Sequence, residues 1–272
     1  MKHFLVVLGF ALLINNSPLS AESPFAFVVY DHRSEEALGA FPPARDVYAK
    51  IVTSLKDYKP IAIVFKYFLD QKKDGPGDQL FARSLKGMEV FFQARIDNTE
   101  KKPNSMDVNY SITLDKVPQK LLSGTSGWLP LPDFAQGAKG IGFVDVRNAD
   151  YFPMYESYQK RVYKSLILSI LSYIFPDLQM SGSYLKRNGR SVVLNEYGEA
   201  KVQYPSSDNL EYVSYCDVVN ETIAKDKLAG KIVLIGYDGP NIDMFTTPLG
   251  EITGHKAYFY GLISLYDELK DK

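Results

Sequence analysis

Charged side chains follow the expected strands of this sequence, at positions where they could bind a ligand. Asp31 and Lys66 come directly after apolar runs typical of buried strands, and Asp243 lies in the loop after a third such run. Because ligands of open α/β sheets bind beyond the carboxyl ends of the strands, we expect these loops to share one edge. Asp31, Asp243 and Arg45, which begins an expected helix, would then form a charged cluster that either binds a polar ligand or braces the loops.

Backbone donors add to this charge at the end of the third strand. Gly236 ends the strand at 231–235, and the N–H groups of residues 236–239 are available to an anion. Arg45 adds a cation at a helix start, which is itself a position that favours anions. We therefore expect a site for a small polar ligand. The candidate binding residues are Asp31, Arg45, Lys66, Gly236, Asp243 and Thr247, the last of which belongs to a sequence motif described below.

The residue pattern does not favour metal binding or catalysis. No two histidines have the close spacing of a ligand pair on one element, so we expect no metal site. A hydrolase would need His32 or His255 as its base, and the sequence has no G-x-S-x-G elbow. Phosphate-loop and dinucleotide signatures are also absent. We therefore expect no cofactor and no enzymatic activity.

The composition is that of a globular protein that does not bind nucleic acid. Of the 272 residues, 46% are hydrophobic, which is enough to build a sizeable core. Lys and Arg number 31 against 32 Asp and Glu, so the net charge of −1 gives no electrostatic footprint for nucleic acid or an anionic membrane surface. Cys216 is the only cysteine. It excludes an intramolecular disulfide and is interpreted as a buried small apolar residue.

The N-terminus has the pattern of a secretory signal peptide. Lys2 and His3 precede an unbroken apolar run at 4–14, and small and polar residues follow up to Ala21. The run is shorter than the roughly 20 apolar residues that span a bilayer. We therefore expect cleavage of residues 1–21, with an uncleaved anchor as the minor alternative. The remaining chain, 22–272, is expected not to be an integral membrane protein.

Apolar runs alternate with helical periodicity and predict an α/β fold. Strands are expected at 24–30, 61–65, 90–94, 141–146 and 231–235, and helices at 45–58, 78–85, 160–175 and 256–269. Strands that are apolar on both faces need cover on both sides, and strand-helix-strand units favour parallel neighbours. We predict a single domain with a mostly parallel, helix-covered, doubly wound sheet, in which 231–235 is central. Residues 34–43 are expected to be a loop, and short strands at 192–194 and 201–204 are expected to pair.

Three stretches of the sequence resemble a known sensory domain. The first is Asp31-x-x-Ser34 with Leu38-Gly39-x-Phe41-Pro42-x-x-Arg45 and Tyr48-Ala49, and the second is Gly142-Phe143-Val144-Asp145-Val146 with Ser165-Leu166. The third is Leu228-x-Gly230-Lys231-Ile232-Val233-Leu234-Ile235-Gly236, followed by Asp243, Thr247-Pro248-x-Gly250 and Gly254-His255-x-Ala257. Together they resemble the second type of CHASE domain, an extracellular module of bacterial adenylate cyclases, histidine kinases and serine/threonine kinases. Phe41 and Pro43 stand where that family usually has Trp, and Lys66 stands where it has an Asp near the end of the second strand.

The resemblance implies a sensory role for an exported, periplasmic or extracytoplasmic protein. Members of that family are usually followed by membrane-spanning helices and a cytoplasmic output domain, and we expect neither in this sequence. We therefore expect a module that binds a small polar ligand and signals in trans through a membrane-bound partner. The first alternative is a non-catalytic adaptor or structural protein of the envelope. The second is an envelope hydrolase that uses Asp31, Asp243 and His255.

Overall fold

The computed structural model describes residues 23–73, 75–99, 104–240 and 242–271. The expected signal peptide at 1–21 and its cleavage site lie outside these residues. Within the described ranges, no helix combines the length and the apolar character that crossing a membrane requires.

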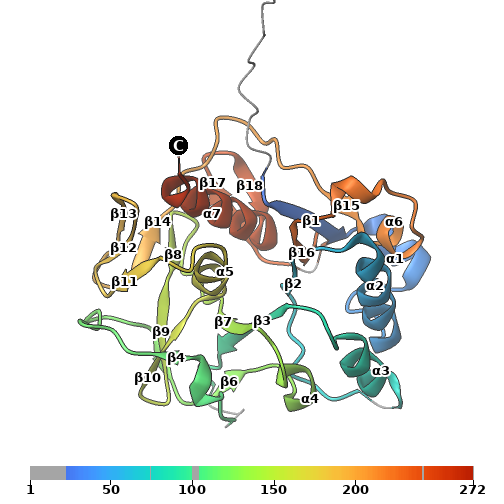
Figure 1. The fold of residues 1–272 in the computed structure, drawn as a ribbon, viewed down its shortest axis with the longest axis horizontal. Coiled ribbons are helices and arrows are strands. Elements are labelled where there is room, and N and C mark those ends of the chain that lie inside the picture. The colour runs from blue at the N-terminus through green and yellow to red at the C-terminus, as the bar shows by residue number, and fades with distance from the viewer. Residues whose placement is uncertain (1–22, 74, 100–103, 241, 272) are drawn as a thin grey trace, which may run out of the picture.

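The largest sheet is mostly parallel (Figure 1). Its strands lie in the order β15, β1, β16, β2, β3, and β3 also pairs with both β7 and β6. Only β6 is antiparallel to its neighbour among the described pairs of this sheet. The strands are β1 (Phe25–Tyr30), β2 (Ala62–Phe65), β3 (Val90–Ile96), β6 (Gly127–Trp128), β7 (Gly140–Phe143), β15 (Val213–Ser214) and β16 (Ile232–Tyr237).

The strand β16 is central, as the sequence predicts. It pairs with β1 on one side, from Phe25 opposite Ile232 to Tyr30 opposite Tyr237, and with β2 on the other. All six of its residues are buried. This position explains why the strand is apolar on both faces, because neither face of a central strand reaches water.

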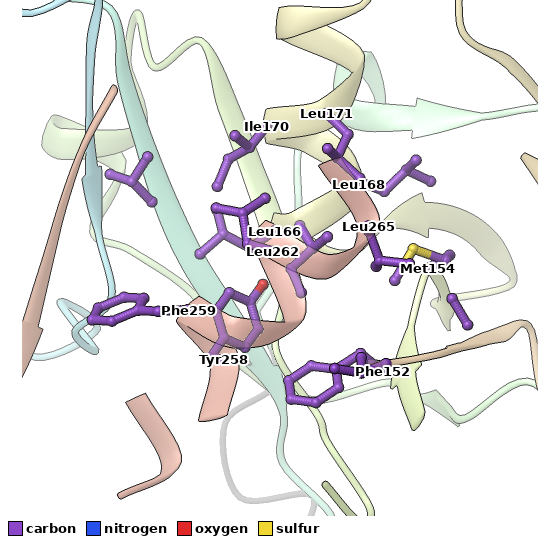
Figure 2. Packing of buried hydrophobic residues seen from close by; sticks show 14 of the residues in the cluster. Phe152, Met154, Leu166, Leu168, Ile170, Leu171, Tyr258, Phe259, Leu262 and Leu265 are labelled. Carbon is purple, nitrogen blue, oxygen red and sulfur yellow. The ribbon is translucent and has the colours of Figure 1, made fainter. Parts of the chain in front are cut away.

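Helices cover both faces of the sheet. One core joins β1, β2 and β16 to α2 (Arg45–Tyr58), α3 (Gly77–Ser84) and α6 (Tyr215–Val219). The other joins the same strands to α5 (Leu166–Ile174) and α7 (Gly254–Leu269), whose side chains pack together in Figure 2. Side chains alternate along each strand, so Phe25 and Phe27 enter the second core while Ala26 and Val28 enter the first. The remaining α-helices are α1 (His32–Leu38) and α4 (Pro132–Ala135).

Smaller sheets surround the main one. The strands β4 (Ser111–Ile112), β10 (Arg161–Lys164), β9 (Tyr155–Tyr158) and β5 (Ser123–Gly124) form one of them, and β11 (Gln179–Ser181), β12 (Tyr184–Arg187) and β13 (Arg190–Val193) form another. Two pairs complete the set, β14 (Glu199–Lys201) with β8 (Tyr151–Pro153) and β17 (Met244–Thr247) with β18 (Gly250–Thr253). Short 3₁₀ helices lie at Val108–Tyr110 and Lys225–Lys227.

The predicted α/β class with a mostly parallel sheet is confirmed, whereas the single, doubly wound domain stays a prediction. Two local predictions are wrong because a capping residue decides them. Asp31 accepts a hydrogen bond from the Ser34 backbone N–H and caps the helix α1, so residues 34–38 of the expected loop are helical. Ser165 accepts one from the Leu168 N–H, so α5 begins at Leu166 and the residues before it form β10.

The expected pairing of 192–194 with 201–204 is also wrong. Asn188 and Gly189 both have positive φ, which is the conformation of a two-residue type I′ hairpin turn. The turn pairs β13 with β12, and β14 instead pairs with β8. Only an isolated bridge joins Leu194 to Ala200.

The burial of β16 predicts the effect of a charge at its centre. Val233 is fully buried, so Val233→Asp should lower the free energy of unfolding by at least about 3 kcal/mol, because it buries an unpaired carboxylate. Val193→Asp is the matched control, since Val193 in β13 is 76% exposed and its substitution should change stability by no more than about 0.5 kcal/mol. Urea unfolding of both variants measures this. Equal midpoints would contradict the central position of β16.

Candidate functional site

A pocket of about 270 Å³ lies beyond the carboxyl ends of β2, β3, β7 and β16. Its walls come from the ends of these strands, the loop before β17 and the first turns of α7. This is the position at which ligands bind in open α/β sheets. The polar residues of its lining are Lys66, Gln93, Arg95, Asp145, Asp243 and His255.

Lys66 supplies a buried cation to this pocket. It directly follows β2 and is 8% exposed. Its Nζ donates a hydrogen bond to Gln93 Oε1 at 2.9 Å and lies 4.6 Å from the centroid of the Tyr258 ring. Burial and the positive charge of Arg95 lower the pKa of Lys66 to about 7, and the negative charge of Asp145 opposes this shift. Among the described residues, no carboxylate lies within ion-pair distance of this ammonium group.

Arg95 and Asp145 form an ion pair in the pocket wall. The distance from Arg95 Nε to Asp145 Oδ1 is 3.4 Å, and Asp145 Oδ2 also accepts a hydrogen bond from the Ile96 backbone N–H at 3.0 Å. Burial raises the pKa of Asp145, although its hydrogen bonds and Arg95 oppose this shift. The carboxylate therefore already has its own cation and backbone donor.

Glu156 lies behind Asp145 and is fully buried. Its Oε1 accepts a hydrogen bond from the Asp145 backbone N–H at 3.3 Å, and its Oε2 has no hydrogen-bond partner. Burial and the negative charge of Asp145 raise the pKa of Glu156 well above its usual range. The neutral carboxylic acid is therefore favoured, and Glu156 adds no counter-charge for Lys66.

The N-terminus of α7 closes another side of the pocket. Thr253 caps the helix, and the Gly254 N–H donates to the carbonyl oxygen of Asp243 at 2.8 Å. His255 Nδ1 accepts a hydrogen bond from the Tyr237 N–H at 2.8 Å. Burial and the charge of Lys66 lower the pKa of His255 well below its usual range, so its ring is neutral and carries its proton on Nε2. The positive end of a helix dipole thus faces the cavity.

Aromatic rings form much of the remaining wall. Phe41 stacks on Tyr237 with ring centroids 4.0 Å apart. Tyr67 packs against Phe41 in an edge-to-face arrangement with ring centroids 5.1 Å apart. The Tyr67 hydroxyl donates to the carbonyl oxygen of Gly236 at 2.5 Å. These contacts fix the rings of the wall and leave an apolar surface beside the buried cation.

Three of the predicted site residues lie in or beside this pocket, and Thr247 lies outside its lining. Lys66 and Asp243 line the pocket, with Asp243 exposed at its rim. Gly236 lies just behind the lining, where an added Cβ would lie 2.7 Å from Phe259 Cζ, so this position needs glycine. Thr247 closes the turn between β17 and β18, since its Oγ1 donates to the Gly250 carbonyl at 2.9 Å.

Asp31 and Arg45 lie outside the lining of this pocket, so the expected cluster with Asp243 does not form. The Asp31 carboxylate accepts hydrogen bonds from Ser34 and from Ser214 Oγ, the latter at 2.8 Å. Burial opposes these bonds, yet together they lower the pKa of Asp31. Arg45 Nε pairs with Asp78 Oδ1 at 2.8 Å. Arg45 is thus a brace between α2 and α3, through a carboxylate that is not a member of the expected cluster.

Several pocket residues are not among the candidates predicted from the sequence. Gln93 and Arg95 lie in β3, and Asp145 follows β7. The rule that selects Lys66, a polar residue at the carboxyl end of a parallel strand, also selects Arg95 and Asp145, whereas Gln93 lies in the middle of β3. Tyr258, in contrast, reaches the pocket from within an amphipathic helix, where the sequence pattern gives no signal beyond that of a core aromatic.

The geometry does not assemble the hydrolase that forms the second alternative. Asp31 is held by two serines at the start of α1, and His255 Nδ1 is occupied by the backbone of Tyr237. Within the described residues, no group of three or more His, Cys, Asp or Glu side chains is arranged to hold a metal ion.

One comparison with known proteins gives a match. A protein-family model, the CHASE2 domain, matches residues 8–263, which is nearly the whole chain. No curated protein and no solved structure shows significant similarity to the sequence.

The buried Arg45 brace predicts a large loss of stability on truncation. Arg45→Ala leaves the buried Asp78 carboxylate without its cation and should lower the free energy of unfolding by about 3 to 5 kcal/mol. The control is Arg33→Ala, because Arg33 forms an exposed ion pair with Asp217 whose loss should change stability by about 1 kcal/mol or less. Urea unfolding compares the two. An Arg45→Ala midpoint equal to that of the wild type would exclude the brace.

The lowered pKa of Lys66 predicts a stability that depends on pH. The buried ammonium destabilises the fold most below about pH 7, and the destabilisation disappears as pH rises toward 10.5, where the unfolded chain also loses the proton. Lys66→Met should therefore stabilise the protein more at pH 6 than at pH 9, by roughly 2 to 3 kcal/mol at about 1.4 kcal/mol per pKa unit. Lys50→Met, at an exposed position, serves as control. An equal effect of Lys66→Met at both pH values would refute the buried-cation description.

Proposed function

The chain belongs to the CHASE2 domain family, a family of sensory domains, and we propose that it senses a small ligand in the pocket beyond β2, β3, β7 and β16. The ligand occupies the cavity between the strand ends and α7. Its binding changes how the surrounding loops and helix pack, and this change is the signal. No bond of the ligand is broken.

The observation that carries this proposal is Lys66, a buried cation that faces a cavity and has no carboxylate partner among the described residues. A buried charge is unfavourable unless it is paired and hydrogen-bonded, and here one amide oxygen and one ring face supply the partners. Such an unfavourable group is retained more readily at a functional site than in a core that only needs stability. An adaptor would have no use for it, and the open cavity supports the sensor over the adaptor.

The place of action is part of the same proposal. CHASE2 is a family of extracellular sensory domains, which supports an extracytoplasmic or periplasmic location. Export after removal of residues 1–21 would bring the pocket into contact with ligands outside the cytoplasm. Signalling in trans through a membrane-bound partner stays a prediction.

A pocket-filling variant tests the proposal. Val146 lines the pocket, so Val146→Trp should fill part of it and prevent binding, whereas Val117→Trp, at an exposed position outside the lining, should not. Thermal unfolding is measured for both variants and the wild type with a panel of envelope metabolites. A ligand at about 100 times its Kd should stabilise the wild type and Val117→Trp by roughly 2.7 kcal/mol, and Val146→Trp by much less. A ligand that stabilises all three proteins equally would place its site elsewhere.

A further inference from the structure

We propose that the ligand of this pocket is a small organic monoanion, a carboxylate with an apolar body, and that Lys66 binds its carboxylate group. The inference rests on the proposed function and adds the chemical class of the ligand. It follows from the charges of the lining, the neutral state of the groups around Lys66 and the apolar character of the walls.

The charges of the lining leave one positive charge to be matched. Arg95 and Asp145 are already paired with each other. Asp243 is exposed at the rim, where water and salt screen its charge. Lys66 remains as the buried charge without an oppositely charged partner among the described residues. One negative charge on the ligand would complete the site, and a second would find no unpaired cation among the described residues of the lining.

The titratable groups that surround Lys66 do not supply this negative charge themselves. From α7, His255 is neutral and Tyr258 keeps its proton, because burial raises the pKa of Tyr258 well above its usual range. Tyr67 keeps its proton for the same reason. Glu156, behind Asp145, is favoured as the neutral acid. The field at the buried end of the pocket is therefore positive, and the N-terminus of α7 adds to it.

The walls and the volume define the rest of the ligand. Phe41, Tyr67, Phe68 and Phe245 surround the cavity with aromatic surface, which suits an apolar body. The volume of about 270 Å³ lies just below the roughly 300 Å³ at which pockets for drug-sized ligands begin. A short aliphatic or single-ring carboxylate fits this space. A phosphate dianion fits the charge less well, because it requires a second unpaired cation.

The affinity for such an anion should depend on the protonation of Lys66. The ammonium form binds the carboxylate, and this form is lost as pH rises through about 7. A carboxylate ligand stays ionised over the same range. Binding should therefore weaken from pH 6 to pH 8.5, by roughly thirtyfold at a tenfold loss per pH unit above the pKa.

Calorimetric titration of the purified chain with matched pairs of compounds tests this inference. The probes are acetate, butyrate, benzoate and phenylacetate, the neutral amide of each acid, and inorganic phosphate. At least one carboxylate should bind ten times or more tightly than its amide at pH 6. Lys66→Met should remove this preference, and Lys66→Arg should keep it and make the affinity independent of pH. Lys164→Met, at a half-buried lysine outside the lining, should bind as the wild type does.

Each other result has a distinct meaning. Amides that bind as tightly as the acids, with no effect of Lys66→Met, would overturn the anionic class and leave the pocket as a ligand site. Inorganic phosphate that binds more tightly than every carboxylate, in a manner that depends on Lys66, would overturn the assignment of the ligand as a carboxylate. Binding of neither member of any pair would overturn this inference, and the metabolite panel with Val146→Trp would then decide on the proposed function separately. If Lys66→Met does not unfold cooperatively, the pH dependence of carboxylate affinity is compared between the wild type and Lys66→Arg. An equal pH dependence in both proteins would overturn the inference.

Discussion

The burial of the main sheet on both faces limits where this protein can place polar chemistry. Strands β1, β2 and β16 are apolar throughout because α2, α3 and α6 cover one face while α5 and α7 cover the other. Polar residues with a chemical role are therefore displaced to the strand ends, where the chain leaves the sheet. Lys66 and Asp145 occupy such positions, directly after β2 and shortly after β7. The same helices that exclude water from the sheet also shield this edge, so a lysine one residue beyond β2 is still buried.

The main elements of the fold could be predicted from the sequence because their signals are local and strong. The strand β16 and the helix α2 appear where apolar runs and helical spacing place them. The errors arise where a single polar side chain outweighs the pattern around it. Ser165 caps α5, so this helix begins later than the apolar pattern predicts. Asp31 caps α1, so part of an expected loop is helical. The partner of β14 depends on contacts between segments far apart in sequence, and periodicity does not report such contacts.

The candidate site was only partly predictable for a related reason. The rule that ligands bind beyond strand ends correctly brings Lys66 and Asp243 to one pocket. It does not say which charged residues will find partners nearby, and Asp31 and Arg45 each find one in a neighbouring element. A sequence lists charges but not their pairing. Lys66 differs from Asp31 and Arg45 in being a buried charge with neither a side-chain cap nor a carboxylate partner among the described residues, and only a three-dimensional arrangement reveals that property.

The position of β16 also has a consequence for how the molecule is made. This strand lies between β1 and β2, yet it comes from the last fifth of the chain, after both of its neighbours and after the four-stranded and three-stranded sheets. A polypeptide that emerges N-terminus first must hold β1 and β2 apart, with the edges that β16 will fill unpaired, until residues 232–237 arrive. Contacts so distant in sequence form slowly, and exposed strand edges invite association with other chains. Biogenesis of this fold should therefore depend on a chaperone that shields the incomplete sheet, and a nascent chain that stops before β16 should aggregate instead of folding in part.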